Sequence, residues 1–292
     1  MAGQVVIVVL NYNGQKCLIK TLTSLRALSY PHKEILVVDN ASSDESFAQA
    51  QAQFPEYSFL ALPRNGGFGY GMNRGIEYAV SKQADYVWLF NYDALAEPDA
   101  LEPLVRAAEQ REDRVLLSPL ILDQYHNNWF SGGRINFLRM RVEHDQGSVP
   151  TKITSTNFLT GCALFLPVSM IQKIGLLDED FFLYYEDADY SLRAKNLQIP
   201  LMVVPASRVL HSEESQFNPT KTYHLVLSGL IFFEKHKNRV FSFYQAIYVI
   251  LRRLKNRFDI LLGQPQATRV REAYQDFYDR KNAHHFSHIR QL

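Results

Sequence analysis

The chain has 292 residues, of which 47% are hydrophobic and 21% charged, which suits one large globular domain or one domain with an appendage. Its two cysteines provide neither a disulfide framework nor a zinc-binding spacing, so we expect a reducing compartment. No apolar stretch reaches the roughly 20 residues of a membrane-spanning helix. The N-terminal apolar run is short and lacks a basic flank, so we expect a strand there and not a signal peptide.

Charge is distributed unevenly along the chain. Residues 235–292 contain 12 Lys/Arg and 4 Asp/Glu, a net charge of +8, whereas residues 1–234 contain 19 and 26, a net charge of −7. An acidic body with a basic tail is an organisational signal. An anionic membrane or a nucleic acid would each explain such a tail.

The first half of the chain alternates short apolar runs with stretches of helical periodicity. Strands are predicted over residues 5–10, 34–38, 58–62 and 86–90. Helices are predicted over residues 16–28, over residues 45–54 with Asp44 as N-cap, and from the glycine-rich loop 65–71 to about residue 82. This alternation predicts a parallel sheet with right-handed crossovers.

Three polar side chains end or closely follow predicted strands of this sheet. They are Asn11, Asp39 and Asp93. Because ligands of such sheets bind at the carboxyl ends of the strands, we expect these residues to mark the binding edge.

The second half is less regular. Residues 129–135 and 160–167 are typical of strands or a hairpin, and residues 202–210 of a further strand that ends at His211. Around Pro219 the pattern changes to helix, and the basic tail begins soon afterwards. We therefore place a boundary near residue 220, between a domain of residues 1–220 and a helical, basic region of residues 221–292.

An acidic cluster follows a run of apolar and aromatic residues in the segment FFLYYEDADYSLR at 181–193. It contains Glu186, Asp187 and Asp189. Carboxylates beside apolar rings lose water and become better bases, as a proton-abstracting enzyme requires. The alternative is a helix N-terminus, where acidic residues favour the helix dipole.

Asp93 and His211 are candidate metal ligands. A carboxylate on a loop after a strand can bind Mg²⁺ or Mn²⁺ and leave room for phosphate oxygens, and manganese also accepts imidazole. Either residue alone is more often structural. Asp39 has a similar ambiguity, because its carboxylate is placed either to accept the ring N–H of a pyrimidine base or to form an Asx turn.

The glycine-rich segment 65–71 does not have the spacing of a dinucleotide-binding loop and does not follow the first strand. It predicts a flexible loop whose backbone approaches a ligand closely, before a helix N-terminus. The alternative is an ordinary glycine turn.

In the basic tail, residues 241–262 place apolar side chains at 244, 247, 251, 254, 258 and 261, which is one helical stripe. A basic amphipathic helix of this kind can lie in a membrane interface. Alternatively, the stripe packs on the main domain or forms a dimer.

Taken together, seven segments resemble the family-2 glycosyltransferases, which are inverting enzymes with the GT-A fold, and they look closest to bacterial rhamnosyltransferase-like members. The segments occur in the family's order and span roughly residues 4–236. They are VVIVVLNYNG at 5–14, ILVVDNASSD at 35–44, NGGFGYGMNRGI at 65–76, LFNYDA at 89–94, FLTGCALFLP at 158–167, GLLDEDFFLYYEDADYSLR at 175–193 and VLHSEES at 209–215.

The resemblance implies an α/β fold with a mostly parallel central sheet flanked by helices, and a C-terminal helical extension. It also implies a role for each matching residue. Asp39 would contact the uracil or thymine base, and Asn11 and Tyr12 would line the base and ribose. Asp187 would be the general base. The other residues implied are Asp93 as the metal ligand of a D-x-D-like motif that begins at Asn91, His211 as the second metal ligand, and Asn65, Gly67 and Glu186 at the substrate site.

The activity implied is a metal-dependent transfer, with Mn²⁺ or Mg²⁺, from a dTDP- or UDP-sugar donor to a saccharide or lipid-linked glycan. We expect dTDP-rhamnose first and a UDP-hexose next, in bacterial surface polysaccharide assembly. We expect a cytoplasmic protein, peripheral on the inner face of the membrane, with no nucleic-acid partner and with a homodimer as one option.

Two other classes stay open. A sugar-1-phosphate nucleotidyltransferase would need a glycine- and lysine-rich triphosphate loop after the first strand, which residues 10–14 do not supply. A non-catalytic glycan-binding protein on a degenerate transferase fold is the other. Residues 223–228 keep it open, because they lack an Arg-Asn pair that many similar enzymes carry there.

Overall fold

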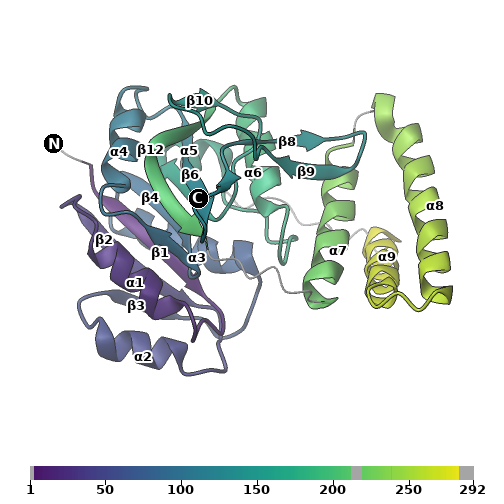
Figure 1. Cartoon of the computed structure of the whole chain (residues 1–292), viewed down its shortest axis with the longest axis horizontal. Coiled ribbons are helices and arrows are strands. Elements are labelled where there is room, and N and C mark those ends of the chain that lie inside the picture. Colours follow the sequence, from purple (N-terminus) through teal and green to yellow (C-terminus); the bar gives the residue numbers. More distant parts are fainter. Residues whose placement is uncertain (1–2, 212–218, 238, 283–292) are drawn as a thin grey trace.

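The computed structural model describes residues 3–211, 219–237 and 239–282, and in these residues a large central sheet is flanked by helices (Figure 1). Four parallel strands form its N-terminal half in the order β4-β1-β2-β3. They are β1 (Val5–Asn11), β2 (Lys33–Asp39), β3 (Ser58–Ala61) and β4 (Tyr86–Asn91). The four predicted strands are thereby confirmed.

Three helices connect these strands: α1 (Leu18–Arg26), α2 (Ser46–Gln53) and α3 (Phe68–Ser81). The N-cap prediction for α2 is wrong by one residue, because Glu45 occupies that position while Asp44 accepts a hydrogen bond from the N–H of Ser46. α3 begins inside the predicted glycine-rich loop. Gly71 lies in this helix because α3 approaches β1 so closely that a Cβ there would stand 2.3 Å from a methyl carbon of Leu10.

The other half of the sheet is mixed. β11 (Ala163–Pro167) is antiparallel to both β4 and β6 (Leu116–Asp123), and β12 (Leu201–His211) is parallel to β6. The register of β12 shifts between Val204 and Arg208, where Pro205 lacks the N–H that a ladder bond needs. The short strands that pair antiparallel with these are β5 (Ala94–Ala96), β7 (Asn128–Phe130) and β10 (Thr154–Ser155).

The remaining elements of this half lie outside the sheet. Helices α4 (Leu101–Glu109), α5 (Val168–Ile174) and α6 (Glu186–Asn196) flank it, and β8 (Gly133–Asn136) with β9 (Arg141–His144) forms a separate hairpin. The predicted strand region 129–135 is therefore divided between β7 and β8.

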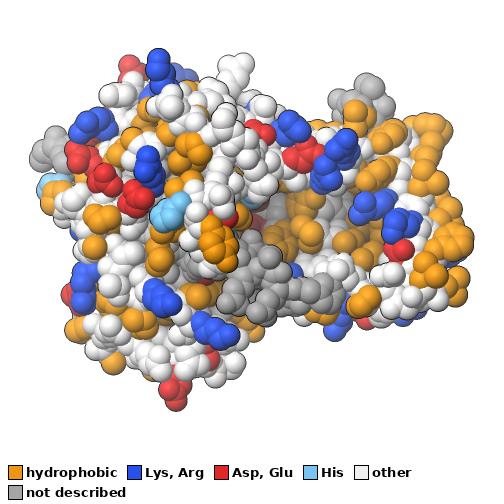
Figure 2. Space-filling model, in the orientation of Figure 1, with side chains coloured by type: hydrophobic (Ala, Val, Ile, Leu, Met, Phe, Trp, Pro, Cys, Tyr) orange, Lys and Arg blue, Asp and Glu red, His pale blue; other side chains and the backbone are white. Residues whose placement is uncertain are grey.

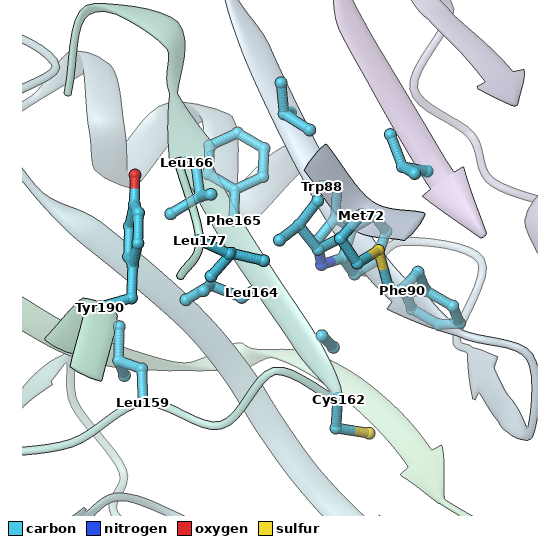
Figure 3. Packing of buried hydrophobic residues seen from close by; sticks show 14 of the residues in the cluster. Met72, Trp88, Phe90, Leu159, Cys162, Leu164, Phe165, Leu166, Leu177 and Tyr190 are labelled. Atoms are coloured by element: carbon cyan, nitrogen blue, oxygen red, sulfur yellow. The ribbon is translucent and has the colours of Figure 1, made fainter. Parts of the chain in front are cut away.

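The core is packed around β4 and β11. Trp88 of β4 is fully buried and meets Phe90 edge-on, with ring centroids 4.8 Å apart. Figure 3 shows Met72 of α3 and Phe165 of β11 beside them. Burying each such side chain stabilises the fold by roughly 1.5–3 kcal/mol.

The chain ends in α7 (Pro219–Lys235), α8 (Arg239–Leu261) and α9 (Ala267–Asn282). Ser228 of α7 donates to the carbonyl of Leu183 over 2.8 Å, and His236, just after α7, lies 2.7 Å from Asp189 of α6. α7 is therefore hydrogen-bonded to α6 and the segment before it, which belong to the main domain. The predicted boundary at residue 220 falls near the start of α7. That boundary stays a prediction.

α8 stands at the far end of the molecule, and the β8–β9 hairpin extends toward it (Figure 1). Tyr244 and Tyr248 donate hydrogen bonds to the carbonyls of Leu138 and Arg139 in that hairpin, over 2.8 and 3.1 Å. The predicted helix 241–262 is thus confirmed as α8. In the described ranges, no helix has both the length and the apolar character needed to cross a bilayer.

Candidate active site

A cavity of about 1080 Å³ lies between the carboxyl edge of the sheet and the C-terminal helices. Figure 2 shows this face hollowed between the main body and those helices. Eight of the ten predicted site residues line it. They are Tyr12, Asn65, Gly67, Asn91, Asp93, Glu186, Asp187 and His211.

The other two predicted residues, Asn11 and Asp39, lie behind the cavity wall. They are paired in register across β1 and β2, and both are buried, at 0% and 5% exposure. The Asn11 amide donates to Asp39 Oδ1 and to Ser46 Oγ, each over 2.8 Å. Ser42 donates its Oγ–H to Asp39 Oδ1 over 2.6 Å and its N–H to Oδ2 over 3.0 Å. In this arrangement Asp39 orders the loop after β2, and its contact with a base stays a prediction.

Asn40, beside Asp39, lines the cavity and was not expected from the sequence. Its amide donates to Asn65 Oδ1 over 2.9 Å and to the carbonyl of Gly67 over 3.0 Å, and its Oδ1 accepts the N–H of Gly66. The loop after β2 is thereby joined to the glycine-rich loop. The position of Asn40 in the turn-rich segment that begins at Asp39, after the strand predicted over residues 34–38, was the available signal.

Gly67 fixes the glycine-rich loop against the segment before α6. Its φ of +92° favours glycine, and a Cβ on it would stand 2.3 Å from the carbonyl oxygen of Phe182. The N–H of Phe68 donates to that same carbonyl over 2.8 Å. The loop is therefore a close backbone contact, and not an ordinary turn.

The segment before α6 is held in an unusual backbone conformation. Tyr184 and Tyr185 have φ values of 69° and 70°, the left-handed region that is costly for residues with a Cβ. Strain of this kind clusters at functional sites. Directly after it, the first turn of α6 carries all three residues of the acidic cluster, so the helix N-terminus interpretation is correct as well.

The three carboxylates of the cluster have different surroundings. Asp187 lines the cavity, and its Oδ2 accepts the N–H of Gly161 over 2.9 Å. Glu186 also lines the cavity but is buried, with no hydrogen-bond partner for Oε2 in the described part of the chain. Asp189 points away from the cavity and pairs with Arg193 and His236, each over 2.7 Å. The fold therefore separates two cavity carboxylates from one structural carboxylate.

Burial raises the pKa of Asp187 to about 6, against the stabilising N–H groups of Gly161 and Ala188. Burial and the charge of Asp187 raise the pKa of Glu186 well above its ordinary value. Burial also opposes ionisation of Asp189, but His236 and Arg193 outweigh it and lower that pKa. Adjacent carboxyls with separated pKa values are typical of sites that move protons near neutral pH.

Asp93 and His211 meet across 118 residues, with Oδ1 and Nε2 3.2 Å apart. Pairing of β5 with β12 brings them together, because His211 is in register with Ala94. Burial opposes ionisation of Asp93, but the hydrogen bond and charge of His211 outweigh it, so the pKa of Asp93 lies below its ordinary value. Burial likewise opposes protonation of His211, but Cys162 and Asp93 outweigh it, so the pKa of His211 is raised.

Asp93 and His211 fit a metal ion that takes its other ligands from a bound molecule. Nδ1 of His211 is buried without a hydrogen-bond partner in the described residues, and the donors are one imidazole and one carboxylate, which Mn²⁺ accepts. The described ranges contain no group of three or more His, Cys, Asp or Glu side chains placed to hold an ion. The remaining ligands would come from a bound phosphate or from water.

The outer wall of the cavity comes from the C-terminal helices and was not expected from the sequence. Lys221 and His224 of α7 and Arg252 of α8 line it. His224 stacks on Phe182, with ring centroids 4.6 Å apart. The wall therefore adds basic groups to a cavity that is also lined by carboxylates. Of the three residues, only Arg252 lies in the basic tail, whose net positive charge was a signal in the sequence.

The fold is that of the GT-A glycosyltransferases. The crystal structure of GalNAc-T7 with UDP, GalNAc and Mn²⁺ superposes with a TM-score of 0.67 at 15% identity. The match covers 80% of this chain and 48% of that one, so this chain spans about half the length of GalNAc-T7.

The sequence model described as glycosyl transferase family 2 matches residues 6–171, and the chain belongs to this family. The chain is 23% identical over 218 residues to the dTDP-rhamnosyl transferase RfbF of Shigella flexneri, covering 73% of this chain and 70% of that protein. It is 24% identical over 243 residues to the N-acetylglucosaminyl-diphospho-decaprenol L-rhamnosyltransferase of Mycobacterium tuberculosis, covering 75% of this chain and 79% of that protein.

Proposed function

We propose that this family-2 glycosyltransferase moves a sugar from a nucleoside-diphosphate donor to an acceptor hydroxyl by a single, inverting displacement. The observation that carries the proposal is the position of Asp187, which faces the same cavity as the Asp93–His211 pair. The same cavity thereby holds a group suited to proton abstraction and a pair suited to a metal-bound diphosphate.

Asp187 is the proposed general base. Its pKa of about 6 leaves it ionised at neutral pH, yet more basic than an ordinary aspartate. The N–H of Gly161 holds one carboxylate oxygen and so fixes its direction. Asp187 would take the proton of the acceptor hydroxyl as the oxygen attacks the anomeric carbon. The nucleoside diphosphate would leave from the opposite face of the sugar.

Asp93 and His211 are the proposed ligands of a divalent metal, Mn²⁺ or Mg²⁺. Such an ion would neutralise the negative charge that develops on the leaving diphosphate. Asp93 sits at the cavity with a side chain that is 25% exposed, so its carboxylate is reachable by a ligand. Lys221 lines the same region and adds positive charge.

The donor is proposed to be dTDP-rhamnose, with a UDP-hexose as the next choice. Support for rhamnose comes from the names of the Shigella and Mycobacterium relatives. Tyr12, Asn40 and Asn65 line the cavity beside the loops that follow β1, β2 and β3, where the nucleoside would bind.

The acceptor is proposed to be a saccharide carried on a diphospho-lipid. The name of the Mycobacterium relative describes an acceptor of this kind. Arg252 of α8 supports the proposal, because a guanidinium on the outer wall is suited to bind a diphosphate.

The test is a thermal-shift screen of UDP, dTDP, GDP and CMP, each with Mn²⁺ or with a chelator, followed by a transfer assay with the matching sugar donors. A ligand that binds the folded state raises the melting temperature. We expect metal-dependent stabilisation by dTDP or UDP, and sugar transfer from the corresponding donor. If no nucleotide shifts the melting temperature, a glycan-binding protein becomes the better explanation.

A further inference from the structure

The side of α8 that faces away from the rest of the molecule is covered by large apolar side chains. Figure 2 shows hydrophobic side chains along this outer edge. We call this surface the outer face of α8, and its members are between 42% and 77% exposed. They are Phe243, Ile247, Ile250, Leu251, Leu254 and Phe258.

The opposite side of α8 is the side that packs on the protein. Gln245 and Asn256 are buried, at 6% and 7% exposure, and the Asn256 amide donates to the carbonyl of Ala267, the first residue of α9. Arg252 lines the cavity from this side. At 3.6 residues per turn, the outer face lies opposite these positions. Of the predicted stripe, Tyr244 contacts the main domain through the carbonyl of Leu138, whereas the positions 247, 251, 254, 258 and 261 are exposed and do not pack on it.

Basic side chains flank the outer face. From residue 242 to residue 261 the helix has four Lys/Arg and one Asp, a net charge of +3. Of the four, Arg252 lines the cavity and Arg253 lies over the ring of Tyr278 in α9, which leaves two near the outer face. Lys255 and Arg257 are exposed, and on a helical projection they fall on either side of the apolar stripe. A wide apolar stripe with basic residues at its margins matches the acyl and headgroup layers of an anionic lipid surface.

We propose that the outer face of α8 binds an anionic membrane surface, with the helix lying in the plane of the headgroups. Charge favours lipid over a second copy of the chain, because two such faces in contact would bring Lys255 and Arg257 of both copies together, and among the described residues only Lys255 of the two has an acidic neighbour, Asp259 at 2.6 Å. Anionic headgroups would instead neutralise both margins.

This placement would hold the cavity about one helix diameter, roughly 10 Å, above the lipid surface. The reason is that the inner side of the same helix forms the cavity wall. The inference concerns a binding surface and does not depend on the transfer reaction. It is therefore tested without donor or acceptor.

The experiment is co-sedimentation of the full chain with vesicles of phosphatidylglycerol and phosphatidylcholine in equal amounts, or of phosphatidylcholine alone. We expect the wild type to bind the anionic vesicles, and binding to weaken at high salt. The double variant Leu254→Glu/Phe258→Glu should lower the partition coefficient at least about tenfold, because it places charges in the apolar stripe. Both positions are exposed, so the fold should survive, which the melting temperature would verify.

A matched control is Gln51→Glu/Gln53→Glu on α2, which adds the same charge at exposed positions of another helix and should bind like the wild type. Lys255→Gln/Arg257→Gln should reduce the preference for anionic vesicles. Equal sedimentation of the wild type and the α8 Glu variant would overturn the proposal. The proposal would also be overturned if the wild type did not sediment with either kind of vesicle and formed a dimer that Leu254→Glu/Phe258→Glu converts to a monomer.

Discussion

The backbone carbonyl of Phe182 accepts a hydrogen bond from the N–H of Phe68 over 2.8 Å, across more than a hundred residues of sequence. This contact joins the glycine-rich loop, on the nucleotide side of the cavity, to the strained segment that precedes Asp187. The two sides of the candidate active site are therefore held at a fixed distance by backbone atoms. Gly67 makes the approach possible, because any side chain there would overlap the same carbonyl.

Replacing Gly67 by alanine should destabilise the protein and reduce transfer together. The Cβ would displace Phe182, and φ is +92°, so we expect a loss of roughly 1–3 kcal/mol in the free energy of unfolding. Chemical denaturation measures this loss. Gly147→Ala is the control, since a Cβ there meets no atom within 4 Å and should change stability little. Equal stability of the two variants would contradict the role of Gly67.

Asp187→Asn should abolish transfer and leave donor binding intact. The amide keeps the shape of the side chain but cannot accept the proton of the acceptor hydroxyl, so we expect kcat to fall about 10²–10⁴-fold. Nucleotide binding, followed by calorimetry, should match the wild type because the proposed metal ligands are Asp93 and His211 and not Asp187. Normal turnover in this variant would remove Asp187 from the mechanism.

The activity should depend on pH through Asp187. Below about pH 6 this carboxyl is protonated and cannot act as a base, so kcat/KM should fall as the pH drops through about 6 and level off above it. A pH profile of kcat/KM measures the midpoint of this acid limb. A midpoint near the ordinary aspartate value of about 3.9 would mean that Asp187 is not desolvated in the working enzyme.

Asp93→Ala should remove the metal dependence of nucleotide binding. Only His211 of the proposed pair would remain, so Mn²⁺ should no longer increase the melting temperature in the presence of dTDP or UDP. Titration of nucleotide with and without Mn²⁺ measures this. If the variant responds to Mn²⁺ as the wild type does, the metal site lies elsewhere.

Arg252→Gln should weaken binding of a diphospho-lipid-linked acceptor and leave donor binding unchanged. Loss of a charge-assisted hydrogen bond from the cavity wall predicts an increase in acceptor KM of about tenfold or more. Steady-state kinetics with a short-chain acceptor would separate this effect from membrane binding. Arg271→Gln, at an exposed position of α9, serves as the control. An unchanged acceptor KM would exclude Arg252 from the acceptor site.

Much of the fold follows from local patterns in the sequence. The buried run of β1 and the helical spacing of α1 are visible there, because hydrophobic periodicity reports which side of an element faces the core. The polar residues at strand ends likewise predicted where the site lies. The direction of β11 was not predictable, because its pairing with β4 and β6 is decided by contacts distant in sequence.

The amino-acid sequence supplies the residues available for chemistry: the acidic cluster of α6, the strand-end aspartates and His211. Which of them share a cavity depends on how distant elements pack. That packing turned Asp187 into the cavity and Asp189 toward Arg193 and His236, and it brought Asp93 to His211. It also turned the apolar stripe of α8 outward. Local periodicity fixes the faces of an element, whereas the packing of distant elements fixes what each face meets.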